Sequence, residues 1–356
     1  MTRRRTYNVA VVGATGAVGT EMLRVLEERR FPIGTLRLLA SARSAGRRLA
    51  FRGTTYRVER LAAGSFAGID VALFSAGAPR SLEFAPAAVK QGAIVVDNSS
   101  AFRMDRGVPL VVPEVNPEAL RGHRGLVANP NCSTIVMLVA LKPLHDAARL
   151  TRIVVSTYQS VSGAGTQAML RLYNESKQAL RQFRVSSSGF RVHSKLETRN
   201  SKPGPLPAQI GFNLIPQVDV FLGNGSTKEE MKMAQETRKI LGAPDLPVSA
   251  TCVRSPVFIA HSEAVWIETA RPLSPARAKA LLRRAPGVRL VDDPGRRRYP
   301  TPVDAAGRDE VLVGRVRKDD STSNGLVLWL CGDNLRKGAA TNAVQIAELL
   351  TTRARR

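Results

Sequence analysis

The residues with the clearest chemical potential surround Cys132, which stands in the polar turn Asn129-Pro130-Asn131-Cys132-Ser133-Thr134. A cysteine attacks an acyl carbon as its thiolate, and a helix N-terminus lowers the pKa of a thiol placed there. The apolar run at residues 134–141 suits a buried helix turn or strand, and after this polar turn we interpret it as such a helix. Cys252 and Cys331 instead lie in apolar, strand-like runs typical of inert core thiols. We therefore predict that Cys132 is a nucleophile that forms a thioester.

A cysteine nucleophile needs a proton-transferring partner, which is generally distant in the sequence. His261 is the candidate, because it precedes a predicted core strand at residues 264–267. A structural role at the start of that strand is the alternative. Arg254 lies seven residues earlier and could hold a carboxylate through two parallel hydrogen bonds. Gln159 follows a strand-like run at 153–157 and could orient an acyl group.

A second chemical signal lies near the N-terminus. There a β-branched run at residues 7–12 leads into Gly13-Ala14-Thr15-Gly16-Ala17-Val18-Gly19, and residues 20–30 have helical spacing. A strand, a glycine turn and a helix can present backbone N–H groups to a dinucleotide pyrophosphate. The spacing departs from the common GxGxxG fingerprint, and a turn used only for close packing is the alternative. The predicted cofactor contacts are Gly13, Thr15, Gly16, Ala17 and Val18.

The end of the predicted second strand, residues 35–39, indicates which cofactor fits. NAD-binding domains usually carry an acidic residue there for the ribose hydroxyl. This chain has Ser41, Arg43 and Ser44 instead. A guanidinium flanked by two hydroxyls suits a 2′-phosphate, so we predict NADPH in preference to NADH.

Strand-like runs at residues 71–74 and 93–96 continue the pattern of a parallel sheet. Ligands of such sheets bind at the carboxyl ends of the strands. Arg103 follows the second run and is therefore expected to face the crevice, with a surface position as the alternative.

Length and composition bound the class of protein. The 356 residues, 44% hydrophobic and 23% charged, suit a globular protein of two domains. No apolar run approaches the length of a membrane span. Three widely spaced cysteines argue for a reducing compartment and against a disulfide framework. No zinc-site spacing occurs, so no metal is expected.

The formal net charge of +24 comes largely from arginine. Dedicated nucleic-acid binding is one interpretation. The aromatic content of 5% leaves few stacking platforms, and no known DNA- or RNA-binding motif occurs. We favour a basic surface that attracts small anionic substrates.

Together these residues resemble the aspartate-semialdehyde dehydrogenases. The resemblance covers nearly the whole chain. It rests on GATGAVG at 13–19, SARSAG at 41–46, DNSSAFR at 97–103, VPEVN at 112–116, NPNCST at 129–134, QSVSGAG at 159–165, IGFNLIPQVD at 210–219, EEMKM at 229–233, ETRKILG at 236–242, RSPVFIAHSEA at 254–264 and GDNLRKGAATNAVQIAE at 332–348.

The resemblance implies NADPH-dependent reductive dephosphorylation of 4-aspartyl phosphate to aspartate 4-semialdehyde. That step serves the biosynthesis of lysine, threonine, methionine and isoleucine. Cys132 would attack the acyl phosphate, and His261 would act as acid and base. The further roles it implies are Asn131 and Gln159 on the acyl group, Arg254 on the α-carboxylate, Glu229 on the α-amino group, Arg103 and Lys232 on phosphate, and Ser162, Gly163 and Asn334 on the cofactor.

The family also implies an α/β architecture. Residues 1–131 would form a Rossmann-like NADP-binding domain. Residues 132–333 would form an α+β mixed-sheet domain for catalysis and dimerisation. A helix within residues 334–356, at about 335–351, would return to the first domain. The protein would be a cytoplasmic homodimer or dimer of dimers.

Two positions depart from the family pattern: Ser255 stands where valine is usual, and Ala260 where glycine is usual. Ala260 would be strained if its backbone needs a positive φ. The segment 182–207 is unusually basic and serine-rich, as a mobile or interface loop would be.

Rival functions share parts of this chemistry. N-acetyl-γ-glutamyl-phosphate reductase uses the same thiol, histidine and NADPH, but its acetylated substrate has no ammonium for Glu229. A glyceraldehyde-phosphate type dehydrogenase would carry a different cysteine motif. The joint presence of Cys132, Gln159, Arg254 and His261 argues against a catalytically silent relative.

Overall fold

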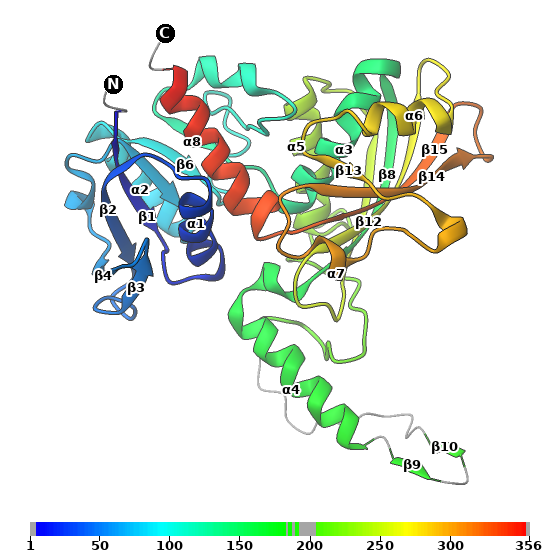
Figure 1. Cartoon of the computed structure of the whole chain (residues 1–356), viewed down its shortest axis with the longest axis horizontal. Coiled ribbons are helices and arrows are strands. Elements are labelled where there is room, and N and C mark those ends of the chain that lie inside the picture. Colours follow the sequence, from blue (N-terminus) through cyan, green and yellow to red (C-terminus); the bar gives the residue numbers. More distant parts are fainter. Residues whose placement is uncertain (1–4, 183, 187–188, 192–203, 354–356) are drawn as a thin grey trace.

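The computed structural model describes residues 5–182, 184–186, 189–191 and 204–353, and in this part the chain folds around two large sheets (Figure 1). The N-terminal sheet is parallel except for its antiparallel edge strand β3. In spatial order its strands are β3 (Arg48–Phe51), β4 (Thr54–Arg60), β2 (Ile33–Ala40), β1 (Tyr7–Val12), β5 (Val71–Phe74), β6 (Ile94–Asp97) and β7 (Leu126–Ala128).

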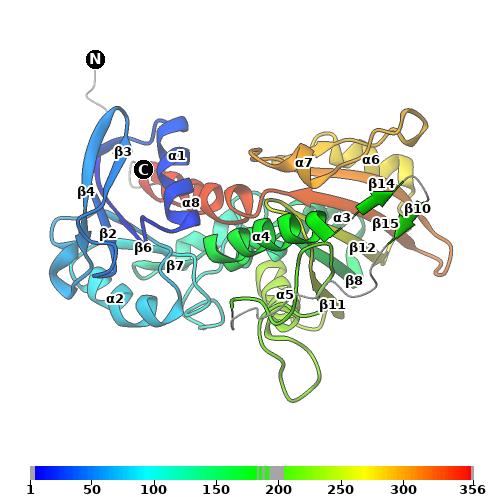
Figure 2. The ribbon, with the colours of Figure 1, turned by 90° about the horizontal axis from the view of Figure 1, so that it is seen from below.

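Helices cover both faces of this sheet, because its parallel strands are apolar on both sides. On one face α1 (Ala17–Glu28) and α8 (Thr341–Arg353) share a core with β1, β2 and β5, and they lie side by side in Figures 1 and 2. On the other face α2 (Ala78–Lys90) packs Phe84, Ala85 and Ala88 against the strands.

The second sheet is mixed and carries helices on one face. Its strands, in spatial order, are β11 (Val248–Arg254), β8 (Leu150–Gln159), β12 (His261–Thr269), β15 (Gly325–Gly332), β14 (Val311–Asp319) and β13 (Val288–Leu290). The helices packed on that face are α3 (Cys132–Ala148), α5 (Lys228–Leu241) and α6 (Pro275–Leu282). Their apolar side chains and the inward residues of the strands form the largest core of the described residues.

The remaining elements are short or peripheral. Helix α4 (Thr166–Gln182) extends away from both sheets, with the hairpin β9 (Arg184–Ser186) and β10 (Gly189–Arg191) beyond its end (Figure 1). The short helix α7 (Pro302–Ala305) packs on β15. The basic segment predicted at 182–207 lies largely outside the described residues.

The predicted strands and helices are present in the structure, but the first or last residue of some of them differs from the prediction. The strands at 7–12 and 71–74 have the predicted bounds. The helix expected at 20–30 begins earlier, at Ala17, because Gly16 is its N-cap. The C-terminal segment begins as a π-helix, Arg336–Ala340, before α8, and its apolar side chains enter the N-terminal core as expected.

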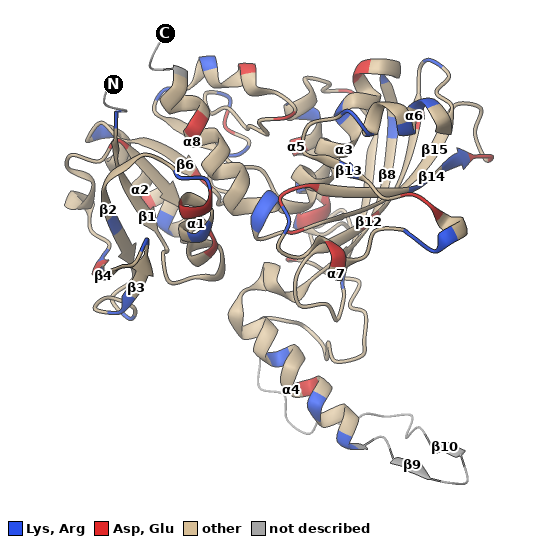
Figure 3. Cartoon of the chain, in the orientation of Figure 1, with Lys and Arg blue, Asp and Glu red and all other residues tan. Residues whose placement is uncertain are grey.

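Charged residues lie on both sheet domains and along α4 (Figure 3). Among the described residues, no helix is long and apolar enough to cross a membrane.

Candidate active site

The predicted nucleophile and its histidine meet where two elements begin. Cys132 is the first residue of α3 and His261 the first residue of β12, and the Sγ–Nε2 distance is 3.2 Å. Cys132 lines a cavity of about 570 Å³, and His261 is fully buried behind it. The structure therefore brings together the pair that the sequence analysis selected from opposite halves of the chain.

The hydrogen bonds around His261 assign its tautomer. The backbone N–H of Ser160 donates to Nδ1 at 3.0 Å, so Nδ1 accepts and the ring hydrogen lies on Nε2, facing Cys132 Sγ. Burial lowers the pKa of His261 well below its usual value, and the charge of Arg254 lowers it further. The ring is thus neutral at neutral pH, and its N–H can stabilise a thiolate by hydrogen bonding.

The pKa of Cys132 differs from the prediction. Helix α3 begins at Cys132 as expected, but burial raises the pKa of the thiol to about 12, and Glu229 adds to the rise. Arg103 and Arg254 act in the opposite direction without reversing it. The prediction of a depressed pKa was wrong, because desolvation of the thiolate outweighs the helix terminus.

This raised pKa predicts how the reactivity of Cys132 depends on pH. Without ligands, the rate of alkylation by iodoacetamide should rise about tenfold per pH unit from pH 7 to pH 9, because the thiolate fraction grows in proportion while the pH stays below the pKa. Mass spectrometry of the Cys132 peptide measures the rate, and the buried Cys252 serves as the slow internal comparison. A plateau below pH 8 would contradict the prediction.

The two amide side chains predicted beside the acyl group converge on Glu229. Asn131 caps α3 through Oδ1, which accepts from the N–H groups of Ser133 and Thr134. Its Nδ2 donates to Glu229 Oε1 at 2.8 Å, and Gln159 Nε2 donates to the same oxygen at 3.2 Å. Glu229 is therefore held in place at the edge of the cavity that Cys132 also lines.

Arg254 lies next to His261, as predicted. A Cβ added to Gly163 would be 3.3 Å from Arg254 Nη1 and 3.5 Å from His261 Cε1, so the glycine lets the loop approach both side chains closely. Nη1 donates to the Ser160 carbonyl, while Nε is buried without a hydrogen-bond partner. Arg254 lines the cavity, and a guanidinium there is suited to an anionic ligand.

The two predicted phosphate ligands both line the cavity, but protein groups already bind them. Arg103 donates to the carbonyls of Asn98 and Asn129 and to Glu236 Oε1, using three of its five N–H groups. Lys232 donates to Glu229 and Asp219. A phosphate would have to share or displace these partners.

Comparison with known proteins accords with this geometry. The model of the semialdehyde dehydrogenase NAD-binding domain matches residues 8–123, and that of the semialdehyde dehydrogenase dimerisation domain matches residues 141–337. The aspartate-semialdehyde dehydrogenase of Aquifex aeolicus is 53% identical over 97% of this chain and 98% of the relative. The chain belongs to the aspartate-semialdehyde dehydrogenase family.

Solved structures of aspartate semialdehyde dehydrogenases have a similar fold. The crystal structure of aspartate semialdehyde dehydrogenase II from Vibrio cholerae is 48% identical, with a TM-score of 0.90 over 98% of this chain and 99% of that one. The aspartate semialdehyde dehydrogenase with NADP from Candida albicans is 25% identical, with a TM-score of 0.72 over 98% and 99%. The family's reaction is NADPH-dependent reductive dephosphorylation of aspartyl phosphate in amino-acid biosynthesis.

The residues of this family member predicted to hold the cofactor occupy two regions. The glycine turn packs at the carboxyl ends of β1 and β5: a Cβ on Gly13 would lie 2.4 Å from the Ser75 carbonyl oxygen. Thr15, Gly16 and Ala17 lead into α1, and Val18 lines the cavity. Ser41, Arg43 and Ser44 form the turn after β2, which borders β1. The close packing accounts for Gly13 by itself, whereas the free N–H groups at the start of α1 fit a pyrophosphate.

The other predicted cofactor residues also position the histidine. Asn334 Oδ1 accepts from Ser160 Oγ, Ser162 Oγ and the N–H of Ala260, while Gly163 lines the cavity. Asn334 thus connects the loop before α4 with the residue that precedes His261.

The family departures have structural explanations. Ala260 has φ +74°, so the expected strain is present and costs about 1–2 kcal/mol relative to an unstrained backbone. Ser255 is buried, and its hydroxyl donates to the Gln159 carbonyl at 3.2 Å.

Glu236 and Asp219 also contact the site, although neither was predicted as a site residue. Glu236 Oε2 accepts the N–H of Asn131 at 2.7 Å while its other oxygen binds Arg103. Its position four residues after Lys232 on a helix was a usable signal. Asp219 comes from an irregular loop, where residue spacing gave no indication of its partner.

Proposed function

We propose that this chain reduces 4-aspartyl phosphate to aspartate 4-semialdehyde through a thioester on Cys132. The observation that carries the proposal is the 3.2 Å approach of His261 Nε2 to Cys132 Sγ in a cavity that also presents Arg254, Glu229 and Lys232. Each of these groups suits one part of that substrate. The Cys132 thiol can attack the acyl carbon, and the Arg254 guanidinium can bind the α-carboxylate. The Glu229 carboxylate can bind the α-ammonium, and the Lys232 ammonium can bind the phosphate.

In this proposal the Cys132 thiolate attacks the acyl carbon, the carbon–oxygen bond to phosphate breaks, and Lys232 and Arg103 stabilise the departing dianion. Asn131 and Gln159 orient the acyl group. NADPH, when bound, supplies the hydride that reduces the thioester. Loss of the carbon–sulfur bond then releases the semialdehyde and regenerates the Cys132 thiolate, to which the Nε2–H of His261 donates a hydrogen bond.

The cofactor fits the residues present. Val18 at the start of α1 lines the same cavity as Cys132, so a dinucleotide on the glycine turn can reach the nucleophile. We assign Gly13, Thr15, Gly16, Ala17 and Val18 to the pyrophosphate end. Ser162, Gly163 and Asn334 belong to the nicotinamide end.

The test is phosphate-dependent reduction of NADP⁺ by aspartate 4-semialdehyde, followed at 340 nm. Activity that requires both phosphate and the semialdehyde supports the proposal. A folded enzyme that instead turns over N-acetylglutamate semialdehyde would overturn it.

Arg43 carries the prediction for cofactor choice. Arg43→Ala should lower kcat/KM for NADPH by about ten- to hundredfold, because a charge-assisted hydrogen bond to the 2′-phosphate is lost. The value for NADH should change less than about twofold. Arg121→Ala, which removes another exposed arginine of the same domain, is the matched control. Equal losses for both cofactors would rule out this role.

We retain the domain limits 1–131, 132–333 and 334–356 as proposals. A homodimer, with a dimer of dimers as the larger form, is proposed on the basis of the matched dimerisation domain. Three free thiols support a cytoplasmic location.

A further inference from the structure

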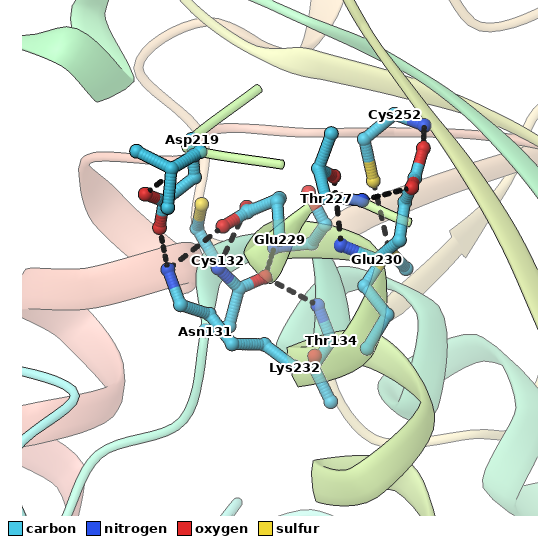
Figure 4. Close-up of polar contacts among 12 residues, drawn as sticks. Asn131, Cys132, Thr134, Asp219, Thr227, Glu229, Glu230, Lys232 and Cys252 are labelled. Carbon is cyan, nitrogen blue, oxygen red and sulfur yellow. Dashed lines mark hydrogen bonds and ion pairs between the residues drawn. The ribbon is translucent and has the colours of Figure 1, made fainter. Parts of the chain in front are cut away.

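The Lys232 ammonium lies between two carboxylates at the mouth of the cavity. Its Nζ donates to Asp219 Oδ2 at 2.7 Å and to Glu229 Oε2 at 3.1 Å (Figure 4). The Lys232 side chain is 19% exposed, and that of Asp219 is 31% exposed. Asp219 is therefore the more accessible of the two acidic partners, since the Glu229 side chain is 6% exposed.

Asp219 is held in place by the loop that carries it. The loop is anchored by two backbone hydrogen bonds between Ile215 and Arg254, and by the N–H of Lys228, which donates to the Val220 carbonyl. Asp219 has φ +67°, and its Oδ1 accepts the N–H of Val220 at 2.9 Å. A non-glycine residue in this region indicates a position that the surrounding structure enforces.

The acids in and next to the cavity have different tasks. Glu229 accepts hydrogen bonds from Asn131, Gln159 and Lys232. Glu236 accepts hydrogen bonds from the Arg103 guanidinium and from the backbone N–H of Asn131. Asp219 receives Lys232 and a backbone N–H of its own loop. Its carboxylate can therefore release Lys232 without disturbing the side chains around Cys132.

We propose that Asp219 is a positioning residue for the step in which phosphate binds or leaves. Its carboxylate holds the Lys232 ammonium while phosphate is absent, and it competes with phosphate for that ammonium. Asp219 thereby weakens phosphate binding and favours its departure after the thioester forms. The inference rests on the proposed function, because it takes Lys232 as a phosphate ligand.

The first test is Asp219→Asn, assayed with the semialdehyde, NADP⁺ and inorganic phosphate. The KM for phosphate should fall by roughly three- to tenfold, as expected for loss of one partly screened ion pair. The KM for NADP⁺ should stay within about twofold. The variant should fold, because asparagine keeps the size of the side chain and tolerates a positive φ.

A double-mutant cycle with Lys232→Met separates this role from a structural one. In the Lys232→Met background, Asp219→Asn should leave the KM for phosphate unchanged. An equal decrease in both backgrounds, or a rise in the KM for the semialdehyde in both, would overturn the proposal; the second result would assign Asp219 to the substrate ammonium.

Asp245→Asn is the matched control for net charge. Asp245 is exposed and lies beyond the far end of α5, roughly 20 Å along the helix from Lys228. Its removal should leave the KM for phosphate unchanged. A wild-type enzyme without phosphate-dependent activity would refute the proposed function, whereas an active wild type with an unaltered Asp219→Asn variant would refute this inference alone.

Discussion

Cys132→Ala should abolish phosphate-dependent reduction of NADP⁺, lowering kcat by on the order of 10⁴- to 10⁶-fold, because no thioester can form without the sulfur. The fold should persist, since an alanine removes a single atom from a position at the edge of a cavity. Steady-state assays at saturating substrate measure the loss, and circular dichroism verifies the fold.

Cys252→Ala is the matched control. Cys252 is fully buried on β11, where its sulfur contacts Met233, and burial raises the pKa of its thiol. Its removal should leave kcat within a few fold of the wild type. Substantial activity in folded Cys132→Ala, or comparable losses in both variants, would exclude Cys132 as the nucleophile.

Arg336→Met should lower the free energy of unfolding by about 2–4 kcal/mol, because it leaves a group of carboxylates without their cation. The Arg336 guanidinium, 6% exposed, binds Glu21 at 3.0 Å, Glu28 at 2.6 Å and Asp309 at 2.8 Å. These residues lie on α1 and in the segment before β14, so the π-helix at 336–340 joins the two sheet domains. Urea unfolding at pH 7 measures the loss.

The matched control and the pH dependence test this explanation. Arg24→Ala removes an ion pair with the same Glu21, but the Arg24 side chain is 53% exposed. This variant should therefore lower the free energy of unfolding by less than about 0.5 kcal/mol. Burial works to raise the pKa of Asp309, but hydrogen bonds from Arg336 and Thr341 lower it below its usual value of 3.8. Its contribution is therefore fully present above pH 3.8 and is lost progressively as the pH falls from that value through the lowered pKa, so the difference in free energy of unfolding between wild type and Arg336→Met should begin to shrink by pH 3. An undiminished difference there would argue against an ionic cause.

Much of the site was predictable because its signals are local. The glycine turn after β1 and the polar turn before α3 are chemical features of contiguous residues. Helical spacing placed Glu229 and Lys232 on one face of α5, where they form an ion pair. Long-range pairing of Cys132 with His261 followed from the chemical requirement for a partner.

Other parts depended on contacts that spacing does not encode. The sequence presents Glu229 and Glu230 as equivalent neighbours. In the structure Glu230 completes the capping box with Thr227 and accepts the N–H of Cys252, while Glu229 faces the cavity (Figure 4). Which acid serves the site was decided by the position of α5 against β11.

The sequence by itself determined the order of the elements, the family and the candidate pair Cys132 and His261, because these reside in residue types and short spacings. The tertiary structure decided the raised pKa of Cys132, the tautomer of His261, the positive φ of Ala260 and the pairing of Lys232 with Asp219. Each of these depends on burial or on partners far away in the chain, since desolvation and hydrogen-bond geometry arise only when distant segments pack together.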